Sequence, residues 1–180
     1  MPAANPLRID VARLGRRPGA LTTRTETVPS PSRIGLDHIA IPVGAPIRLD
    51  LTLQSVSEGV LVTGTVEAQT VGECSRCLTE FDGKVDIELT ELFAYPDSTT
   101  EATTEADEVG HLVDDIVDLE QSIVDAVGLK LPFAPVCRPD CPGLCPQCGV
   151  ALAEAEPDHQ HDVIDPRWAK LAEFRAEADE

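Results

Sequence analysis

Residues 136–165 read VCRPDCPGLCPQCGVALAEAEPDHQHDVID. This segment places four cysteines within twelve residues and follows them with two histidines, which is the composition of a metal-binding motif. Thiolate sulfur and imidazole nitrogen are the ligands that tetrahedral Zn²⁺ prefers, and a Cys-x-x-Cys turn lets two sulfurs approach one ion to about 2.3 Å. In the turn CPQC at residues 145–148, proline favours the turn, and Gly149 can adopt the positive φ that follows it.

A second Cys-x-x-Cys pair lies upstream, so all six cysteines of the chain fall into pairs with metal-ligand spacing. Six thiols and two histidines supply eight ligands, enough for two four-coordinate ions. We expect one Zn²⁺ to be held by Cys74, Cys77, Cys137 and Cys141, and a second by Cys145, Cys148, His159 and His161. An alternative places the four clustered cysteines on a single ion and leaves the upstream pair free.

Two other roles for cysteine are less favoured. A disulfide framework is unexpected, because residues 1–20 lack the apolar core of a secretory signal and six cysteines in 180 residues are few for a disulfide-rich secreted domain. A thioredoxin-like pair at Cys74 and Cys77 would sit at the start of a helix, whereas strand-like segments flank this pair. Catalytic zinc keeps an open position, so two complete ligand sets predict structural sites.

The formal charge of −18 is unevenly distributed along the chain. Residues 1–50 carry seven arginines against four acidic residues, a net charge of +3, while residues 51–180 carry a net charge of −21. Such an acidic body repels the phosphate backbone of nucleic acids and attracts basic proteins. No apolar run approaches the roughly eighteen residues that a membrane helix needs. We therefore expect a soluble, cytoplasmic protein that does not bind membranes.

Alternating apolar and polar residues predict an antiparallel β-meander in a domain formed by residues 1–136. The expected sheet is either open or a partly closed barrel. Cys74 and Cys77 fall in the connection between its second and third long strands. The segments with strand periodicity are residues 7–11, 47–54, 60–66 and 85–93.

The remaining segments predict loops and helices. Residues 22–33, rich in Thr, Ser and Pro, predict a linker or exposed loop, and residues 97–109 predict a flexible acidic loop. A helix is expected at about 118–128, with Asp118 as its N-cap, Gln121 at the third helical position and Gly128 at its end. A last helix is expected to open at Asp165. The predicted fold class is α+β, with a zinc-clamped C-terminal lobe at residues 137–180.

The chain offers no convincing catalytic constellation. His38 and His111 are isolated, and neither a phosphate-binding glycine loop nor a His-Glu-x-x-His motif is present. We therefore expect a protein that is not an enzyme and has no small-molecule substrate.

The order of these motifs resembles the bacterial YceD family, the family of the large ribosomal RNA subunit accumulation protein. The motifs that carry the resemblance are ECSRCL at 73–78, LP at 131–132, GLCPQCG at 143–149 and DPR at 165–167. The resemblance covers nearly the whole chain and implies a role in the synthesis, processing or stability of large-subunit (23S) ribosomal RNA. Many members carry Cys-x-Cys where this chain has His159-Gln160-His161. Histidine remains a competent zinc ligand, although its affinity for zinc decreases as the pH falls through the range in which imidazole is protonated.

Charge and resemblance together predict a non-catalytic ribosome biogenesis factor. Its acidic face would bind a basic large-subunit ribosomal protein or a pre-ribosomal particle. An alternative is direct rRNA contact through the basic N-terminal arm and the lobe, with phosphate contacts from Arg16, Arg17, Arg138 and Arg167. A metal-dependent RNA-processing enzyme is a weaker alternative, because the chain lacks the carboxylate cluster and open metal position that it would need.

Overall fold

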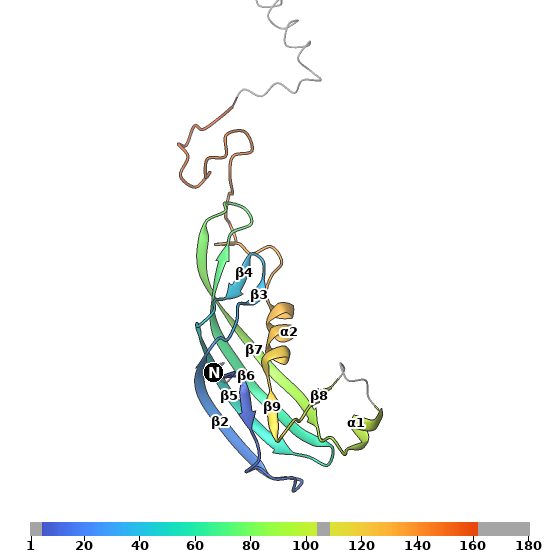
Figure 1. Ribbon diagram of the computed structural model, residues 1–180. Helices are drawn as coiled ribbons and strands as arrows, with labels where there is room; N and C mark the ends of the chain where they lie inside the picture. Colours follow the sequence, from blue (N-terminus) through green and yellow to red (C-terminus); the bar gives the residue numbers. More distant parts are fainter. Residues whose placement is uncertain (1–4, 104–108, 162–180) are drawn as a thin grey trace, which may run out of the picture.

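The computed structural model describes residues 5–103 and 109–161 and shows an elongated molecule with a curved sheet that leads into a cysteine-rich lobe (Figure 1). The lobe comprises described residues 137–161. The strands are β1 (Arg8–Asp10), β2 (Leu21–Pro29), β3 (Ile34–Leu36), β4 (Ile39–Ile41), β5 (Pro46–Ser55), β6 (Gly59–Glu73), β7 (Glu80–Ala94), β8 (Gly110–His111) and β9 (Ile116–Asp118), and the helices are α1 (Thr99–Thr103) and α2 (Glu120–Lys130). The fold is therefore mostly antiparallel sheet.

The long strand β6 is the centre of the seven-stranded sheet. Along one edge it pairs with β7 over its whole length, from Gly59 opposite Ala94 to Glu73 opposite Glu80. Along the other edge it pairs first with β5 and then, near its end, with β4. The order β2-β5-β6-β4-β3 ends at β2 and β3, and no pairing among the described strands closes the sheet. The described sheet is open, and the partly closed barrel that we considered is not confirmed.

One face of the sheet carries the hydrophobic core. In β5 the Ile and Leu side chains alternate with polar ones and are at most 1% exposed. Helix α2 and the small β1–β9 sheet cover this face, as Figure 1 shows. The predicted strand segment 7–11 contains β1, and the other three lie within β5, β6 and β7, which confirms the predicted strands. The covering side chains with 3% exposure or less include Ile9, Val117, Leu119, Ile123 and Val127.

The prediction of a loop at residues 22–33 is wrong. Most of this segment forms β2, an edge strand that pairs with β5 from Leu21 opposite Gln54 to Pro29 opposite Pro46. Both faces of β2 are largely exposed, so its sequence lacks the apolar alternation that reveals a half-buried strand. Threonine favours strands, and proline is tolerated on edge strands. These two preferences explain how a Thr- and Pro-rich segment joins the sheet.

Helix α2 confirms the predicted element but corrects both of its ends. Leu119 occupies the N-cap position without a side-chain cap, while the Asp118 carboxylate accepts a hydrogen bond from the Glu120 N–H at 3.1 Å. Gly128 lies inside the helix, which ends at Lys130. Leu131 is extended because the proline that follows disfavours the helical conformation.

Two other expectations concern segments that the structure describes only in part or not at all. The predicted acidic loop at 97–109 contains the short helix α1, whose Thr100 N–H donates to the Glu58 carboxylate at 3.0 Å. The helix expected from Asp165 lies outside the described residues. None of the helices in the described parts of the chain is long and apolar enough to cross a membrane.

Candidate metal centres

The first group of metal-ligand side chains joins the tip of the β6–β7 hairpin to the beginning of the lobe. Its ligands are Cys74, Cys77, Cys137 and Cys141, whose sulfur atoms all lie within 4.8 Å of one another. The Cys74 and Cys141 sulfurs are 3.8 Å apart, and the Cys77 and Cys137 sulfurs are 3.7 Å apart. Four sulfurs placed tetrahedrally about 2.3 Å from one Zn²⁺ are separated by about 3.8 Å. The group therefore has the size of a tetrahedral zinc site.

The hairpin tip is a Cys-x-x-Cys turn with a defined backbone. The Cys74 N–H donates to the Thr79 carbonyl at 3.0 Å, and the Leu78 N–H donates to the Cys74 carbonyl at 2.8 Å. Leu78 adopts a φ of 58°, a left-handed conformation that is unfavourable for a branched side chain. This turn directs the Cys74 and Cys77 sulfurs toward the same point.

Hydrogen bonds hold the lobe, and the segment that leads into it, against this turn independently of any ion. The Ser75 N–H and hydroxyl both donate to the Pro135 carbonyl, at 2.8 and 2.9 Å. The Arg76 guanidinium donates to the Cys141 carbonyl at 3.0 Å, and the Arg76 carbonyl accepts from the Leu144 N–H at 3.1 Å. These side chains were not singled out by the sequence, since Ser75 and Arg76 fill only the variable positions of a Cys-x-x-Cys motif.

The second group lies within the lobe and consists of Cys145, Cys148, His159 and His161. The Cys148 sulfur is 3.6 Å from Nε2 of His159, which is 3.1 Å from Nε2 of His161. A tetrahedral zinc ion with sulfur at about 2.3 Å and nitrogen at about 2.0–2.1 Å separates sulfur from nitrogen by about 3.6 Å and two nitrogens by about 3.3 Å. This group also fits a tetrahedral ion.

The local backbone explains the position of the Cys145–Cys148 pair. Gly149 has a φ of 75°, as its sequence position predicts, and its N–H donates to the Cys145 carbonyl at 2.8 Å. The chain then returns, so that the Cys145 N–H donates to the Val150 carbonyl at 2.8 Å. A further turn brings the histidines toward these cysteines, and it is closed by a hydrogen bond from the His159 N–H to the Glu156 carbonyl.

Neighbouring groups lower the pKa of thiols in both groups. The His159 side chain, followed by backbone N–H groups of Cys148 and Gln147, lowers the pKa of Cys145 to about 6. Burial raises the pKa of Cys74, but hydrogen bonds from several backbone N–H groups outweigh it and lower the value to about 6. Removal from water and the neighbouring thiols raise the pKa of Cys137 to about 12. A cation is therefore needed to deprotonate the complete first set.

All eight predicted ligands lie in these two groups, and all six cysteines are free of disulfides. The structure does not bring the four clustered cysteines together around one point, which was the alternative arrangement. One neighbour was missed by sequence reasoning: the Thr79 hydroxyl lies 3.4 Å from the Cys77 sulfur, and it lowers the pKa of Cys77. A hydroxyl residue two positions after the Cys-x-x-Cys motif was the signal for it.

Residues 62–175 match the family described as "Large ribosomal RNA subunit accumulation protein YceD". The chain belongs to the YceD family. The YceD match begins in β6 and includes both groups of metal-ligand side chains, with the His-x-His pair of the second group. The family name links such proteins to the accumulation of large-subunit ribosomal RNA.

Mycobacterial proteins are similar to this YceD chain over nearly its whole length. An uncharacterized protein of Mycobacterium tuberculosis H37Rv is 68% identical over 171 residues, which cover 95% of this chain and 82% of the relative. An uncharacterized protein of Mycobacterium leprae is 59% identical over 172 residues, covering 96% of this chain and 79% of the relative. No solved structure matches the chain.

Proposed function

We propose that this YceD protein promotes the synthesis, processing or accumulation of 23S ribosomal RNA as a non-catalytic ribosome biogenesis factor. The family match carries this proposal, because it spans the sheet from β6 onward and both groups of metal ligands. The function takes place in the cytoplasm, where ribosomes assemble.

The eight cysteine and histidine ligands hold two structural Zn²⁺ ions in this proposal. The spacing of both ligand sets supports it, since the separations match a tetrahedral ion. Both sets offer four protein ligands and leave no coordination position for a substrate. Bound zinc would tie the hairpin tip to the lobe and close the lobe on itself. The division into a sheet domain (residues 1–136) and a zinc lobe (137–180) stays a prediction.

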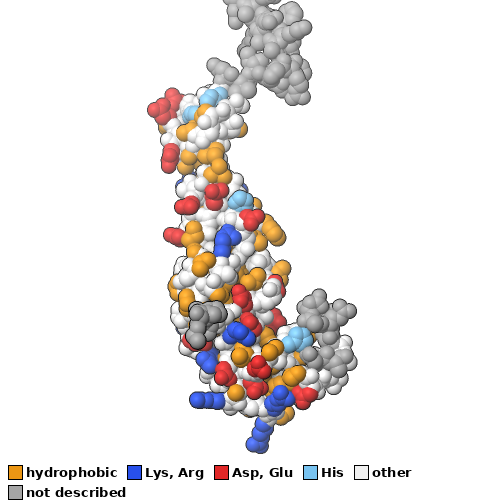
Figure 2. Space-filling view, in the orientation of Figure 1, with side chains coloured by type: hydrophobic (Ala, Val, Ile, Leu, Met, Phe, Trp, Pro, Cys, Tyr) orange, Lys and Arg blue, Asp and Glu red, His pale blue; other side chains and the backbone are white. Residues whose placement is uncertain are grey.

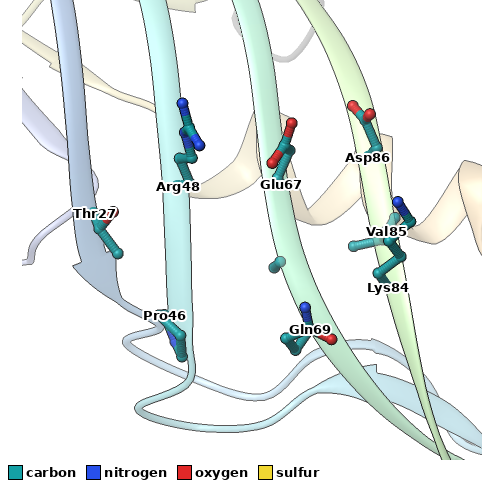
Figure 3. A pocket seen from close by; sticks show the side chains of 9 residues that line it. Thr27, Pro46, Arg48, Glu67, Gln69, Lys84, Val85 and Asp86 are labelled. Carbon is teal, nitrogen blue, oxygen red and sulfur yellow. The ribbon is translucent and has the colours of Figure 1, made fainter.

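The partner is a basic protein of the large subunit, alone or in a pre-ribosomal particle. Support comes from the exposed polar face of the sheet, where Arg48, Glu67 and Asp86 lie side by side across β5, β6 and β7 (Figure 3). They line a shallow depression of about 230 Å³. On the same face, β7 also carries Glu80, Asp82 and Glu88 beside one lysine. A basic surface would be drawn to this side of the sheet.

Direct RNA binding through the N-terminal arm is less well supported. The Arg16 guanidinium lies 2.8 Å from the Asp97 carboxylate and stacks 4.6 Å from the centre of the Tyr95 ring. Arg138 lies 3.5 Å from Asp140. Two of the proposed phosphate contacts therefore already have acidic neighbours, and Arg167 lies outside the described residues. In the view of Figure 2, most Lys and Arg side chains gather toward the end opposite the lobe, with acidic side chains spread among them.

Deletion of the gene in its own host tests the proposed function directly. We expect the ratio of 23S to 16S ribosomal RNA to fall and to recover on expression of the wild-type chain. An unchanged ratio under slow and fast growth would contradict the rRNA role. Purified, zinc-loaded protein should leave precursor 23S RNA intact, and metal-dependent cleavage would instead show an RNA-processing enzyme.

A further inference from the structure

Among the described residues, the outer edge of β7 has no strand partner over most of its length. Strand β7 pairs with β6 along one edge, but its other edge pairs with β8 only at Phe93 and Ala94. In the described part of the chain, residues 80–92 therefore present an unpaired edge. Such an edge is a template for an added strand.

Backbone alternation shows which residues would pair with an added strand. The Ala94 carbonyl accepts from the Leu112 N–H at 3.0 Å and so points away from β6, whereas the Tyr95 N–H donates toward the β6 side, to the Glu58 carbonyl at 2.9 Å. Because backbone groups alternate along a strand, the even-numbered residues from Asp82 to Leu92 direct their N–H and C=O groups outward.

An apolar groove of about 960 Å³ opens beside this edge on the core face of the sheet. Strand β7 contributes Phe81, Val85 and Ile87, and the end of α2 contributes Leu129 across from them. The Leu129 side chain is 89% exposed, and Phe133, four residues later, is 86% exposed. Leu129 lines the groove and Phe133 follows the lining residue Pro132, so apolar side chains exposed to this degree indicate an interaction site here.

The groove also contains a buried polar group without a partner. Thr70 on β6 lines the groove and is 1% exposed, yet its hydroxyl makes no hydrogen bond. Gly83 on β7 keeps the adjacent space open, since a Cβ at this position would lie 2.8 Å from the Thr70 hydroxyl oxygen. A buried hydroxyl without a partner is unfavourable, so a bound segment that supplies a polar group here would satisfy it.

The charge beside the edge defines the partner's chemistry. On the polar face, the even-numbered side chains of β7 around the groove are Glu80, Asp82, Lys84, Asp86 and Glu88, four acids and one base. A second copy of this edge would place acidic side chains opposite acidic side chains, which is unfavourable. An added strand with basic side chains on this face and apolar side chains on the other would match both surfaces.

We propose that the β7 edge and the adjoining groove bind an extended segment of a basic protein as an added strand, with alternating Lys or Arg and apolar side chains. This proposal rests on the proposed function, because it identifies the surface that would receive the basic partner. The main-chain hydrogen bonds would come from the outward-facing residues of β7, and the apolar side chains would enter the groove.

Fluorescence anisotropy with a labelled peptide tests this surface on the full, zinc-loaded chain. The probe is a peptide of about ten residues that alternates lysine and valine, matched to the alternation of a strand. Its control has the same composition with all lysines first. We expect the alternating peptide to bind at least tenfold more tightly than the control. On binding, hydrogen exchange should slow at the amides of Asp82, Lys84, Asp86 and Glu88.

Lys84→Pro separates strand pairing from charge attraction. The substitution removes an outward-facing N–H and also a positive charge, so strand pairing predicts at least tenfold weaker binding and charge alone predicts equal or tighter binding. If this variant fails to fold, Leu129→Ser serves instead, because the exposed leucine can be replaced without loss of core packing; we expect it to weaken binding at least threefold. Glu67→Gln, on the neighbouring strand, is the matched charge control and should change affinity less than Asp86→Asn.

Equal binding of both peptides, or binding without slowed exchange in β7, would overturn the proposal. A concentration-dependent dimer that protects the same amides without any peptide would overturn it in favour of self-association. Neither result bears on the proposed function, which the 23S to 16S ratio of the deletion strain tests separately. If the peptide binds the β7 edge but the deletion strain keeps an unchanged ratio, the proposed function is rejected while the binding surface stands.

Discussion

Replacing Cys77 by serine should destabilise the whole sheet, whereas replacing Cys148 should affect the lobe alone. The pairs Cys77–Cys137 and Cys148–His159 approach each other across 60 and 11 residues of chain, respectively. The first segment contains β7 and α2, which build the core, while the second lies entirely within the lobe. Cys77 is suited to the test because it is only partly buried, whereas serine at the fully buried Cys74 would also change packing.

The magnitude follows from chain entropy. Each Cys-x-x-Cys pair can still bind zinc in the unfolded chain, so the ion's contribution to folding comes mainly from closing the segment between two ligand pairs. Treated as a cross-link, closure of 60 residues stabilises the fold by about 4 kcal/mol, and closure of 11 residues by about 3 kcal/mol. Only the first of these contributions adds to the free energy of unfolding of the sheet.

Urea unfolding of zinc-loaded protein, followed by far-ultraviolet circular dichroism, measures the difference. With a denaturant slope of about 2 kcal/mol/M, Cys77→Ser should lower the sheet's midpoint by about 2 M. Cys148→Ser should leave that midpoint nearly unchanged. Metal content, measured on the same samples, should fall from two ions to one in both variants. Equal midpoint shifts in the two variants, or loss of an ion from Cys77→Ser without any shift, would refute the reasoning.

Three further predictions concern other parts of the molecule. Protein purified without added metal should contain two zinc ions per chain, falling to one in Cys145→Ser and in His159→Ala; since the pKa of Cys145 is lowered to about 6, its thiolate stabilises the zinc-bound fold fully above the ordinary thiol pKa and this contribution is lost as the pH falls through 6, so elemental analysis after dialysis at lower pH should show loss of the lobe's ion. Ser55→Ala should destabilise the sheet by about 1–3 kcal/mol in urea unfolding, because it removes the partner, 2.9 Å away, of the buried Tyr95 hydroxyl; an unchanged midpoint would contradict this bond. Thr70→Val should raise the unfolding free energy by about 1 kcal/mol or more, since it replaces an unpartnered buried hydroxyl with a methyl group; destabilisation would mean that the hydroxyl has a partner.

Patterns that extend over a few neighbouring residues made four of the nine described strands and all candidate ligands recognisable in the sequence. Alternation in β5 predicts both the strand and its buried face, because successive side chains of a strand point to opposite sides. The Cys-x-x-Cys spacing likewise predicts paired sulfurs, because one turn of chain suffices to bring them together. Helix α2 was recognisable, but its ends were not, because the restriction imposed by Pro132 on Leu131 outweighs the breaking tendency of Gly128.

The sequence alone determined which residues are suited to bind metal and which segments alternate, since both properties are local. The sequence favoured one pairing of these ligands but left an alternative open, and only the tertiary structure decided that Cys77 meets Cys137 while Cys148 meets His159, because that choice depends on where the β6–β7 hairpin and α2 direct the chain. It also decided that β2 is a strand and that β7 keeps an open edge beside a groove. Pairing between distant strands sets both features, and no run of neighbouring residues records which edge of a strand is left without a partner.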